Sequence, residues 1–386
     1  MRFVVAAIIM LLASVKFTAA APHLFVDVRS GKVLSQEQAF DRWYPASLTK
    51  LMTAYTVFHA LKQGKITKLS PVVVSQHALN QPPSKMGYPV GSVLNIDTAI
   101  KILMVKSAND ISVAVAEAVG GSEPAFVAAM NAHAQRLGLR DTQFTNPHGL
   151  HDPQQYTSAR DMAVLALALK KEFPQHAGYF NIPAIKSDKK ILPNHNPFLS
   201  RYDGATGMKT GFVCASGLNI VVTVKRHGRE TVGVVLGGPT GQERNVRAAR
   251  LFDETFRKAP FFMTAKLDTL SRPASAKTQP FDMRPVVCKN SKERKAERAT
   301  DKWKQWKAAL DEEEEKRLGP KQRSSRYIPV VLGNATGPDP YGLLRAEAAS
   351  GSNLTAYALD SSSSEWPTVF GSKRVKVPVP ARRPNR

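Results

Sequence analysis

Cysteine is scarce in this chain of 386 residues, which contains only Cys214 and Cys288. Two cysteines cannot form the disulfide framework of a small secreted scaffold, so a hydrophobic core must hold the fold together. In an oxidising compartment the two residues could pair, and the bridge would clip the segment after Pro260 to the main domain. The sequence leaves open whether they do.

Long apolar runs are also missing, with one exception at the N-terminus. Arg2 is followed by an apolar run over residues 3–15 and then by small residues from Thr18 to Ala21. This order is typical of a secretory signal peptide, with cleavage expected after Ala20 or Ala21. An uncleaved anchor is the alternative, but the run is shorter than the roughly 20 apolar residues that span a bilayer. We therefore expect an exported protein without a later membrane helix.

Acidic residues are few relative to basic ones: 31 Asp and Glu stand against 54 Lys and Arg, a formal net charge of +23. Such a charge favours anionic surroundings, such as a cell wall, a membrane surface or nucleic acid. Because the protein is expected to be exported, we exclude nucleic acid as a partner.

The basic character continues to the C-terminus, where residues 261–386 hold 24 Lys and Arg and 14 Asp and Glu with few apolar runs. This composition predicts a largely disordered tail. The exception is 291–318, which we interpret as one charged, solvated helix because its apolar face is narrow. Contact of Trp303 and Trp306 with a membrane or a partner is the alternative.

The most informative motif is a serine and a lysine three residues apart, Ser47 and Lys50, at the start of an apolar periodic segment. In a helix this spacing places both side chains on one face, so the amine can reach the hydroxyl. A lysine shielded from water has a lowered pKa and can take the proton that makes serine a nucleophile. The same spacing recurs at Ser187 and Lys190 in a lysine-rich run without helix signals, so the motif alone has little weight.

Two further motifs follow in a fixed order. Ser107-Ala108-Asn109 is the only Ser-x-Asn of the chain, and Lys209-Thr210-Gly211 is the only Lys-Thr-Gly. Helices expected from about Asp97 and over 109–119 place the first motif at a joint, from which side chains can point into a cleft. An ordered trio of this kind is typical of penicillin-binding proteins and class A β-lactamases.

The hydrophobic period changes along the chain from strand to helix and back to strand. We predict a β-hairpin over 24–34, then helices over about 45–64, from about 97, and over 109–119, 123–137 and 158–170. A polar loop region over 173–203, strands over 209–213, 218–225 and 231–236, and a closing helix over 245–258 follow. This order predicts an α+β fold, in which an antiparallel sheet built from both ends of the domain holds an inserted helical block. Such a fold would bring Ser47, Ser107 and Lys209 together at one seam.

His148 and His151 lie close together in the sequence. A histidine pair in a loop without a third ligand is more often structural than metal-binding. We therefore expect no metal and no cofactor.

The three motifs, their order and the leader resemble the D-alanyl-D-alanine carboxypeptidases, which are low-molecular-mass penicillin-binding proteins with a β-lactamase/transpeptidase-like fold. The segments Asn146–Leu150, Tyr156–Ala163 and Gly207–Phe212 add to the resemblance. The resemblance covers residues 21–260, which we expect to be the catalytic domain, between the signal peptide over 1–20 and the basic tail over 261–386.

The resemblance implies a serine hydrolase of the periplasm or cell wall that removes the terminal D-alanine from peptidoglycan stem pentapeptides, in cell wall biogenesis and cell shape. Ser47 would form the acyl-enzyme with Lys50 as its base. Ser107 would relay a proton to the leaving amine, and Asn109 would orient Lys50 and the substrate amide. β-Lactams would acylate the same serine as inhibitors.

The implied substrate-binding residues are Lys209, Thr210, Gly211, Phe212 and Arg244. Lys209, Thr210 and Arg244 would hold the free carboxylate of the substrate, which an arginine fork suits. Gly211 would let the substrate lie flat against its strand. The backbone amide of Phe212, with that of the nucleophile, would form the oxyanion hole.

Two features depart from the family pattern. The basic tail resembles neither the small β-domain nor the amphipathic anchor that follow the catalytic domain in many members. Val213 and Cys214 stand where polar residues are frequent. Membrane attachment and substrate detail therefore do not follow from the resemblance.

Three alternatives remain open. A β-lactamase would need a deacylating glutamate between the second and third motifs, where Glu172 lies at a lysine-flanked helix end. A D,D-endopeptidase would cleave only cross-links. A non-catalytic wall-binding protein would explain the charge and the tail but would leave the three motifs unaccounted for.

Overall fold

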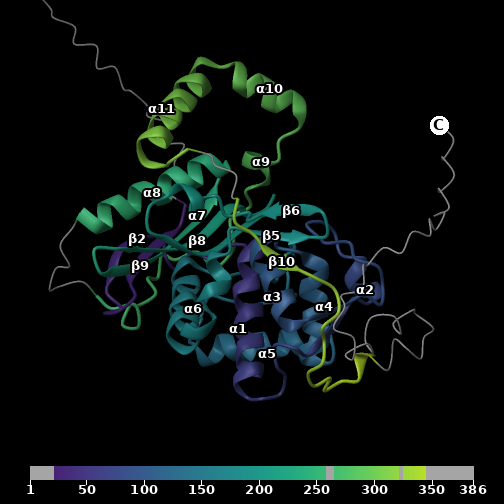
Figure 1. Cartoon of the computed structure of the whole chain (residues 1–386). Helices are drawn as coiled ribbons and strands as arrows, with labels where there is room; N and C mark the ends of the chain where they lie inside the picture. The colour runs from purple at the N-terminus through teal and green to yellow at the C-terminus, as the bar shows by residue number, and fades with distance from the viewer. Residues whose placement is uncertain (1–20, 258–264, 321–324, 345–386) are drawn as a thin grey trace, which may run out of the picture.

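The computed structural model describes residues 21–257, 265–320 and 325–344 (Figure 1). The predicted signal peptide lies outside the described residues, as do the expected domain boundary near Pro260 and positions 345–386 of the basic tail. What is described is an α+β domain and a C-terminal segment that packs against it.

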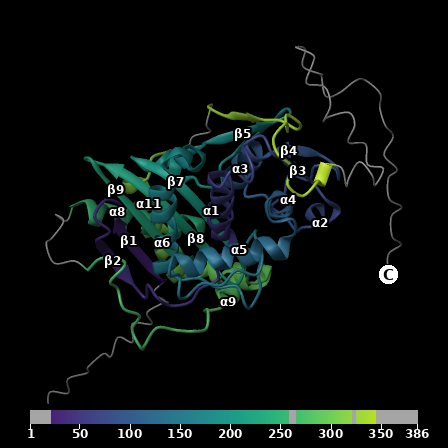
Figure 2. The same cartoon turned by 90° about the horizontal axis from the view of Figure 1, so that it is seen from below.

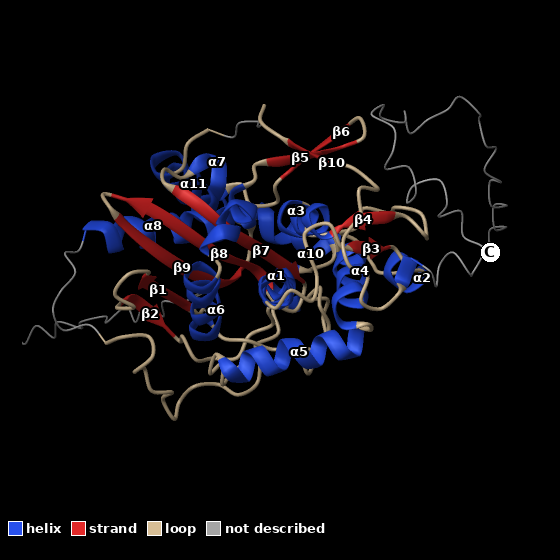
Figure 3. Cartoon of the chain, turned by 60° about the horizontal axis from the view of Figure 1, so that its bottom comes forward, coloured by secondary structure: helices blue, strands red, loops and turns tan. Residues whose placement is uncertain are grey.

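The centre of the domain is a five-stranded antiparallel sheet with the order β2-β1-β9-β8-β7 (Figure 3). Its strands are β1 (His23–Asp27), β2 (Val33–Glu37), β7 (Ala205–Val213), β8 (Gly217–Arg226) and β9 (Arg229–Gly238). The first two and the last three come from opposite ends of the domain, and β1 pairs with β9. The prediction of a sheet built from both ends is confirmed.

The inserted block contains α1 (Thr49–Lys62), α2 (Gln76–Leu79), α3 (Ile96–Val105), α4 (Asn109–Gly120), α5 (Glu123–Arg136) and α6 (Ala159–Glu172), with a small sheet of β3 (Pro71–Val73) and β4 (Val93–Asn95). Side chains of Ser75, Asn95, Ser122 and Ser158 accept the hydrogen bonds that begin four of these helices. Figure 2 shows the block beside the sheet, with α1 between them.

Within the described residues, no single helix is long and apolar enough to cross a membrane. Helices α4 and α5 reach the required length and hydropathy only when they are taken together, and the chain bends by 83° between them.

Alternate residues of the sheet face two different layers, as the period of two in a strand requires. Val232 and Val234 belong to the main core, which they share with α1 and α6. Ile220 and Val235 face the other way and pack with Phe252 of α8 (Gly241–Arg257). The sheet is therefore covered on both faces by helices (Figure 1).

The prediction of a polar loop region over 173–203 is wrong in part. This region contains the 3-10 helix η2 (Pro174–Asn181), β5 (Ala184–Ser187), β6 (Lys190–Pro193) and α7 (Phe198–Arg201). Its buried apolar residues, such as Ile185 and Phe198, are too widely spaced to show a period. Ser187 and Lys190 face each other across the β5–β6 hairpin rather than along a helix.

The tail is more ordered than its composition predicts. Its described part forms α9 (Arg284–Val287), α10 (Ser291–Ala299), α11 (Asp301–Arg317) and β10 (Ile328–Val330), which joins β5 in parallel. The single helix expected over 291–318 is two helices, because Thr300 is extended and its hydroxyl caps α11. Leu310 and Leu318 are buried against α8, so the solvated interpretation holds for α10 but not for α11.

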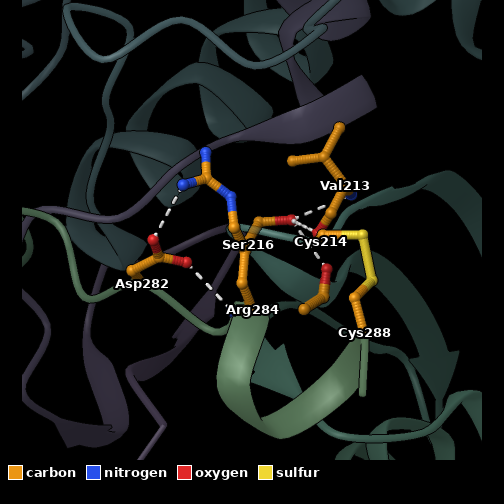
Figure 4. The surroundings of a disulfide bond; sticks show 7 residues. Val213, Cys214, Ser216, Asp282, Arg284 and Cys288 are labelled. Atoms are coloured by element: carbon orange, nitrogen blue, oxygen red, sulfur yellow. Dashed lines mark hydrogen bonds and ion pairs between the residues drawn. A yellow bond between two sulfur atoms is a disulfide. The ribbon is translucent and has the colours of Figure 1, made fainter. Parts of the chain in front are cut away.

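A disulfide joins Cys214 to Cys288, with 5.6 Å between the Cα atoms (Figure 4). Cys214 directly follows β7, and Cys288 directly follows α9. Of the two possibilities that the sequence left open, the structure has the bridge. It clips the C-terminal segment to the edge strand of the sheet.

Replacing both cysteines with serine should lower the free energy of unfolding by about 2–4 kcal/mol, because the bridge restricts the unfolded chain over a separation of 74 residues. Urea unfolding of the oxidised protein and of the double variant measures the difference. Thiol titration of the denatured, unreduced protein is the control: it should detect no free thiol, and two thiols per chain would contradict the bridge.

Candidate active site

The predicted site residues converge on one cleft of about 560 Å³ at the junction of the sheet edge and the helical block. Seven of the nine line it: Ser47, Ser107, Asn109, Thr210, Gly211, Phe212 and Arg244. The remaining two, Lys50 and Lys209, are buried behind its wall, and each lies within hydrogen-bond distance of one of the two serines. Segments far apart in the sequence thus meet at the predicted seam.

The nucleophile candidate Ser47 lies in the short turn η1 (Ala46–Leu48), directly before α1. The side-chain amide of Asn219, on β8, donates hydrogen bonds to the carbonyl oxygens of Tyr44 and Pro45 at 2.9 and 3.1 Å. The sheet therefore fixes the backbone that leads into the turn. No motif in the sequence indicates this role of Asn219.

Two glycines allow the backbone to pass close to the same turn. A Cβ atom at Gly211 would lie 2.9 Å from the backbone nitrogen of Ser47 and 3.0 Å from the carbonyl oxygen of Pro45. At Gly149, where φ is +89°, it would lie 1.9 Å from the carbonyl oxygen of Ala46. The glycine of the third motif is therefore needed for contact with the nucleophile's turn, a reason that differs from the expected approach of substrate.

The Lys50 amine is completely surrounded by protein. Its Nζ lies 3.2 Å from Ser47 Oγ, 2.8 Å from Asn109 Oδ1 and 2.6 Å from the carbonyl oxygen of His148. The amide and carbonyl oxygens can only accept, so a neutral amine donates its two hydrogens to them. Its lone pair then remains to accept the hydroxyl proton of the serine, which is the arrangement that a general base requires.

Asn109 is held in the orientation that this arrangement needs. Its side-chain nitrogen donates to the carbonyl oxygen of Pro82 at 2.9 Å, which leaves Oδ1 to face Lys50. Ser107 sits between α3 and α4, at the predicted joint, and its left-handed φ of 61° marks the sharp turn between them.

The second serine and lysine form a similar pair. Lys209, on β7, donates to Ser107 Oγ at 2.9 Å and to the carbonyl oxygen of Thr210 at 3.0 Å. Burial, together with the positive charge of Arg244, lowers the pKa of Lys209 to about 7. The lysine thus links the second motif to the third.

Electrostatics favour a neutral Lys50. Burial lowers its pKa well below the ordinary value, and the positive charge of Lys209 acts in the same direction, while Asp110 opposes them. Asp110 also accepts hydrogen bonds from the backbone of Met86 and Gly87, which fixes a loop beside the cleft. Sequence reasoning did not identify this carboxylate.

The cleft is also lined by two of the predicted carboxylate-binding residues, Arg244 and Thr210. Arg244, near the start of α8, is buried, and its guanidinium donates to Asn245 Oδ1 at 2.8 and 3.1 Å. Thr210 donates its hydroxyl to the carbonyl oxygen of His195 at 3.3 Å. Burial lowers the pKa of His195, another cleft residue that sequence reasoning missed, to about 4, so its imidazole is neutral at pH 7.

The other candidates from the sequence lie away from this chemistry. His148 contributes its backbone oxygen, while its imidazole is buried; His151 is exposed beside Tyr44. Glu172 binds Arg136 and Tyr55, and it does not line the cleft. Among the described residues, no group of three His, Cys, Asp or Glu side chains could hold a metal ion.

Together these groups suit acyl transfer. A serine hydroxyl with an uncharged amine as its base can attack a carbonyl carbon. A second hydroxyl beside a second amine can pass a proton to a leaving group, and an arginine with a threonine can bind a carboxylate.

A family described as D-alanyl-D-alanine carboxypeptidase matches residues 12–240, more than half of the chain. The chain is 35% identical over 250 residues to the D-alanyl-D-alanine carboxypeptidase DacA of Haemophilus influenzae, covering 64% of each protein. It is also 35% identical over 241 residues to DacF of Bacillus subtilis, covering 61% of this chain and 62% of the relative. The match spans less than two thirds of the length of either relative.

Solved structures give the same fold. Penicillin binding protein 5 from Haemophilus influenzae superposes with a TM-score of 0.59 at 35% identity, covering 61% of this chain and 70% of the other. The carboxypeptidase DacD from Francisella tularensis superposes with a TM-score of 0.60 at 28% identity, covering 62% and 70%. The predicted fold class is thereby confirmed.

Replacing Lys209 with methionine should raise the pKa of Lys50, because it removes the positive charge that helps to lower that pKa. A lysine must lose its proton before it can act as a base, so the rise of reactivity with pH should move to higher pH. The measurement is the normalised pH profile of Ser47 acylation by a penicillin. Lys225→Met, which removes an exposed charge on β8, should leave the profile in place; an unshifted profile for Lys209→Met would contradict the coupling.

Proposed function

The chain belongs to the D-alanyl-D-alanine carboxypeptidase family, and on this premise we propose that it is a serine hydrolase that removes the terminal D-alanine from peptidoglycan stem pentapeptides. One observation carries the proposal. A fully buried lysine amine lies 3.2 Å from the hydroxyl of Ser47, behind the wall of a cleft that is also lined by Arg244.

The first half-reaction forms an ester on Ser47. Lys50 takes the hydroxyl proton while Oγ attacks the carbonyl carbon between the two D-alanines, giving a tetrahedral oxyanion. The backbone amides of Ser47 and Phe212 stabilise that charge; the first lies at a helix start, where amides lack intrahelical partners. Asn109 keeps the lysine amine aimed at the hydroxyl.

Collapse of this intermediate breaks the peptide bond. The proton moves from Lys50 through the Ser107 hydroxyl to the leaving nitrogen, so D-alanine departs as a neutral amine that is protonated in solution. Water then attacks the ester, Ser47 recovers its proton, and the stem peptide leaves shortened by one residue. Lys209, bonded to Ser107 Oγ, holds this second hydroxyl in position.

Recognition of a free C-terminus follows from the charges in the cleft. The substrate carboxylate binds Arg244 and the hydroxyl of Thr210, and the positive charge of Lys209 attracts it. Phe212 has half of its surface exposed, at 51%, on the cleft wall, where it can pack against the substrate. A peptide without a terminal carboxylate would leave the buried guanidinium unpaired.

β-Lactams acylate Ser47 in this proposal, because their strained amide and carboxylate place the same groups as the peptide end. A β-lactamase function is disfavoured by the position of Glu172, which pairs with Arg136 away from the cleft. A purely wall-binding function does not explain why two lysine amines are buried beside two serine hydroxyls.

The test is D-alanine release from a stem pentapeptide. The wild-type chain should release it, and Ser47→Ala should lower kcat by at least about 10⁴-fold, because the nucleophile is lost. Ser187→Ala is the matched control, since Ser187 has the same spacing to a lysine but lies on a hairpin. Release that survives in Ser47→Ala, or no release by the wild type, would refute the proposal.

We also propose that the chain is exported to the periplasm or cell wall and that the tail contacts an anionic surface there. The N-terminal pattern over 1–20 supports export. Exposed basic residues of α10, among them Lys292, Arg294, Lys295 and Arg298, support the contact.

Co-sedimentation with isolated cell walls and with anionic vesicles tests this contact. Binding should fall as salt rises, because the attraction is between exposed charges. As a separate check of export, the N-terminus of the secreted protein should lie near Ala21, where cleavage of the signal peptide is expected. Binding that is unchanged when all four basic residues of α10 are replaced with glutamine would show that this surface does not mediate the contact.

A further inference from the structure

The C-terminal segment returns to the cleft and forms part of its wall. After the disulfide, α10 leads into α11, which lies along α8 (Figure 1). Leu310 and Leu318 pack into the apolar cluster beneath α8. Arg317 pairs with Asp253 at 2.7 Å. These anchors place one acidic residue of α11, Glu314, in the lining of the cleft that contains Ser47.

Glu314 is fixed on two sides. Its carboxylate pairs with the guanidinium of Arg201, at the end of α7, and accepts a hydrogen bond of 2.5 Å from the side-chain amide of Gln242. The side chains of Glu314 and Arg201 are only 13% and 7% exposed. Arg201 is held in turn by the carbonyl oxygen of Gly319, at 2.8 Å.

Arg201 and Glu314 line the cleft together with Arg244. Gln242 is two residues before Arg244 at the start of α8, and both line the cleft with Glu314. In the proposed function, Arg244 binds the carboxylate of the departing D-alanine. A leaving group larger than one small amino acid would have to extend past that carboxylate toward the wall formed by Arg201 and Glu314.

We propose that Glu314 and Arg201 are specificity-determining residues that restrict the leaving group to a single small amino acid. The inference rests on the proposed function and deepens it, because it favours release of free D-alanine over cleavage of cross-links. In a cross-link, the departing amine belongs to a second stem peptide, whose bulk would meet the wall formed by Arg201 and Glu314.

The wall cannot move aside easily. Displacing Glu314 would leave a largely buried guanidinium without its partner, and an unpaired buried charge is costly. The helix that carries it is anchored by Leu310 and by the Arg317–Asp253 pair, neither of which depends on Glu314. The wall is thus part of the packed structure rather than a flexible side chain.

The experiment compares two substrates of the full-length protein: a stem pentapeptide ending in D-Ala-D-Ala, and a cross-linked dimer with the same acyl half. The wild type should have the higher kcat/KM on the pentapeptide. The double variant Arg201→Ala/Glu314→Ala should raise the ratio of dimer to pentapeptide kcat/KM by about tenfold, the scale of a pocket-size change. Its pentapeptide kcat/KM should stay within about threefold.

Two further variants separate the effect of the size of the Glu314 side chain from the effect of its charge and from general effects of changing α11. Glu314→Gln keeps the size of the side chain and one oxygen that can accept from Arg201, so its ratio should stay closer to that of the wild type than to that of the double variant. Glu315→Ala removes an exposed neighbouring carboxylate of α11 and should change nothing. A dimer preference in the wild type would overturn the inference even if the double variant did not fold.

The experiment distinguishes failure of this inference from failure of the proposed function. If the wild type releases D-alanine but the double variant keeps the wild-type ratio, or Glu314→Gln changes it as much as the double variant does, the wall is not the determinant and the proposed function stands. If the wild type neither releases D-alanine nor reacts with a labelled penicillin at Ser47, both the proposed function and this inference fall.

Discussion

The burial of one lysine amine is the constraint on which the rest of the site depends. An ammonium group without water around it is costly, and the pKa of Lys50 falls because of burial and the charge of Lys209. Two fixed acceptors, the Asn109 amide oxygen and the His148 carbonyl, use the two hydrogens of the neutral amine. The lone pair is then directed at the hydroxyl of Ser47, so the same burial that costs stability supplies the base.

The sheet and the segments packed against it position the groups of this arrangement. The sheet forms only when strands from both ends of the domain pair. Its edge strand β7 then lies against the turn that carries Ser47. Gly211 permits that contact, and Asn219 ties the neighbouring strand to the same turn. The C-terminal segment, clipped to the edge strand through Cys214, completes the far wall of the cleft.

The sequence predicted the parts of the site that depend on local spacing. Ser47 and Lys50 are one helical turn apart, and the second motif stands at a joint of helices, so both could be placed without coordinates. The carbonyl of His148 and the amide of Asn219 could not, since a backbone oxygen has no sequence signal and the second contact spans more than 170 residues.

A helix was expected over 291–318, but the packing of α11 against α8 was missed for a similar reason, because its buried apolar contacts come from Leu310 and Leu318 in a highly charged segment. Composition averages over such a segment, whereas packing depends on the few residues that reach the core. Its contribution to the cleft, through Glu314, follows from that packing and has no local motif.

The arrangement around Lys50 makes this residue an uncharged base in the free protein. An NMR titration of the lysine side chains, in the protein labelled at the lysine carbons, can observe this directly, with the Lys50 signal assigned by its loss in Lys50→Arg. Lys50 should lose its proton well below the ordinary lysine range near 10.5, before the surface lysines do. A Lys50 signal that titrates together with the surface lysines would contradict it.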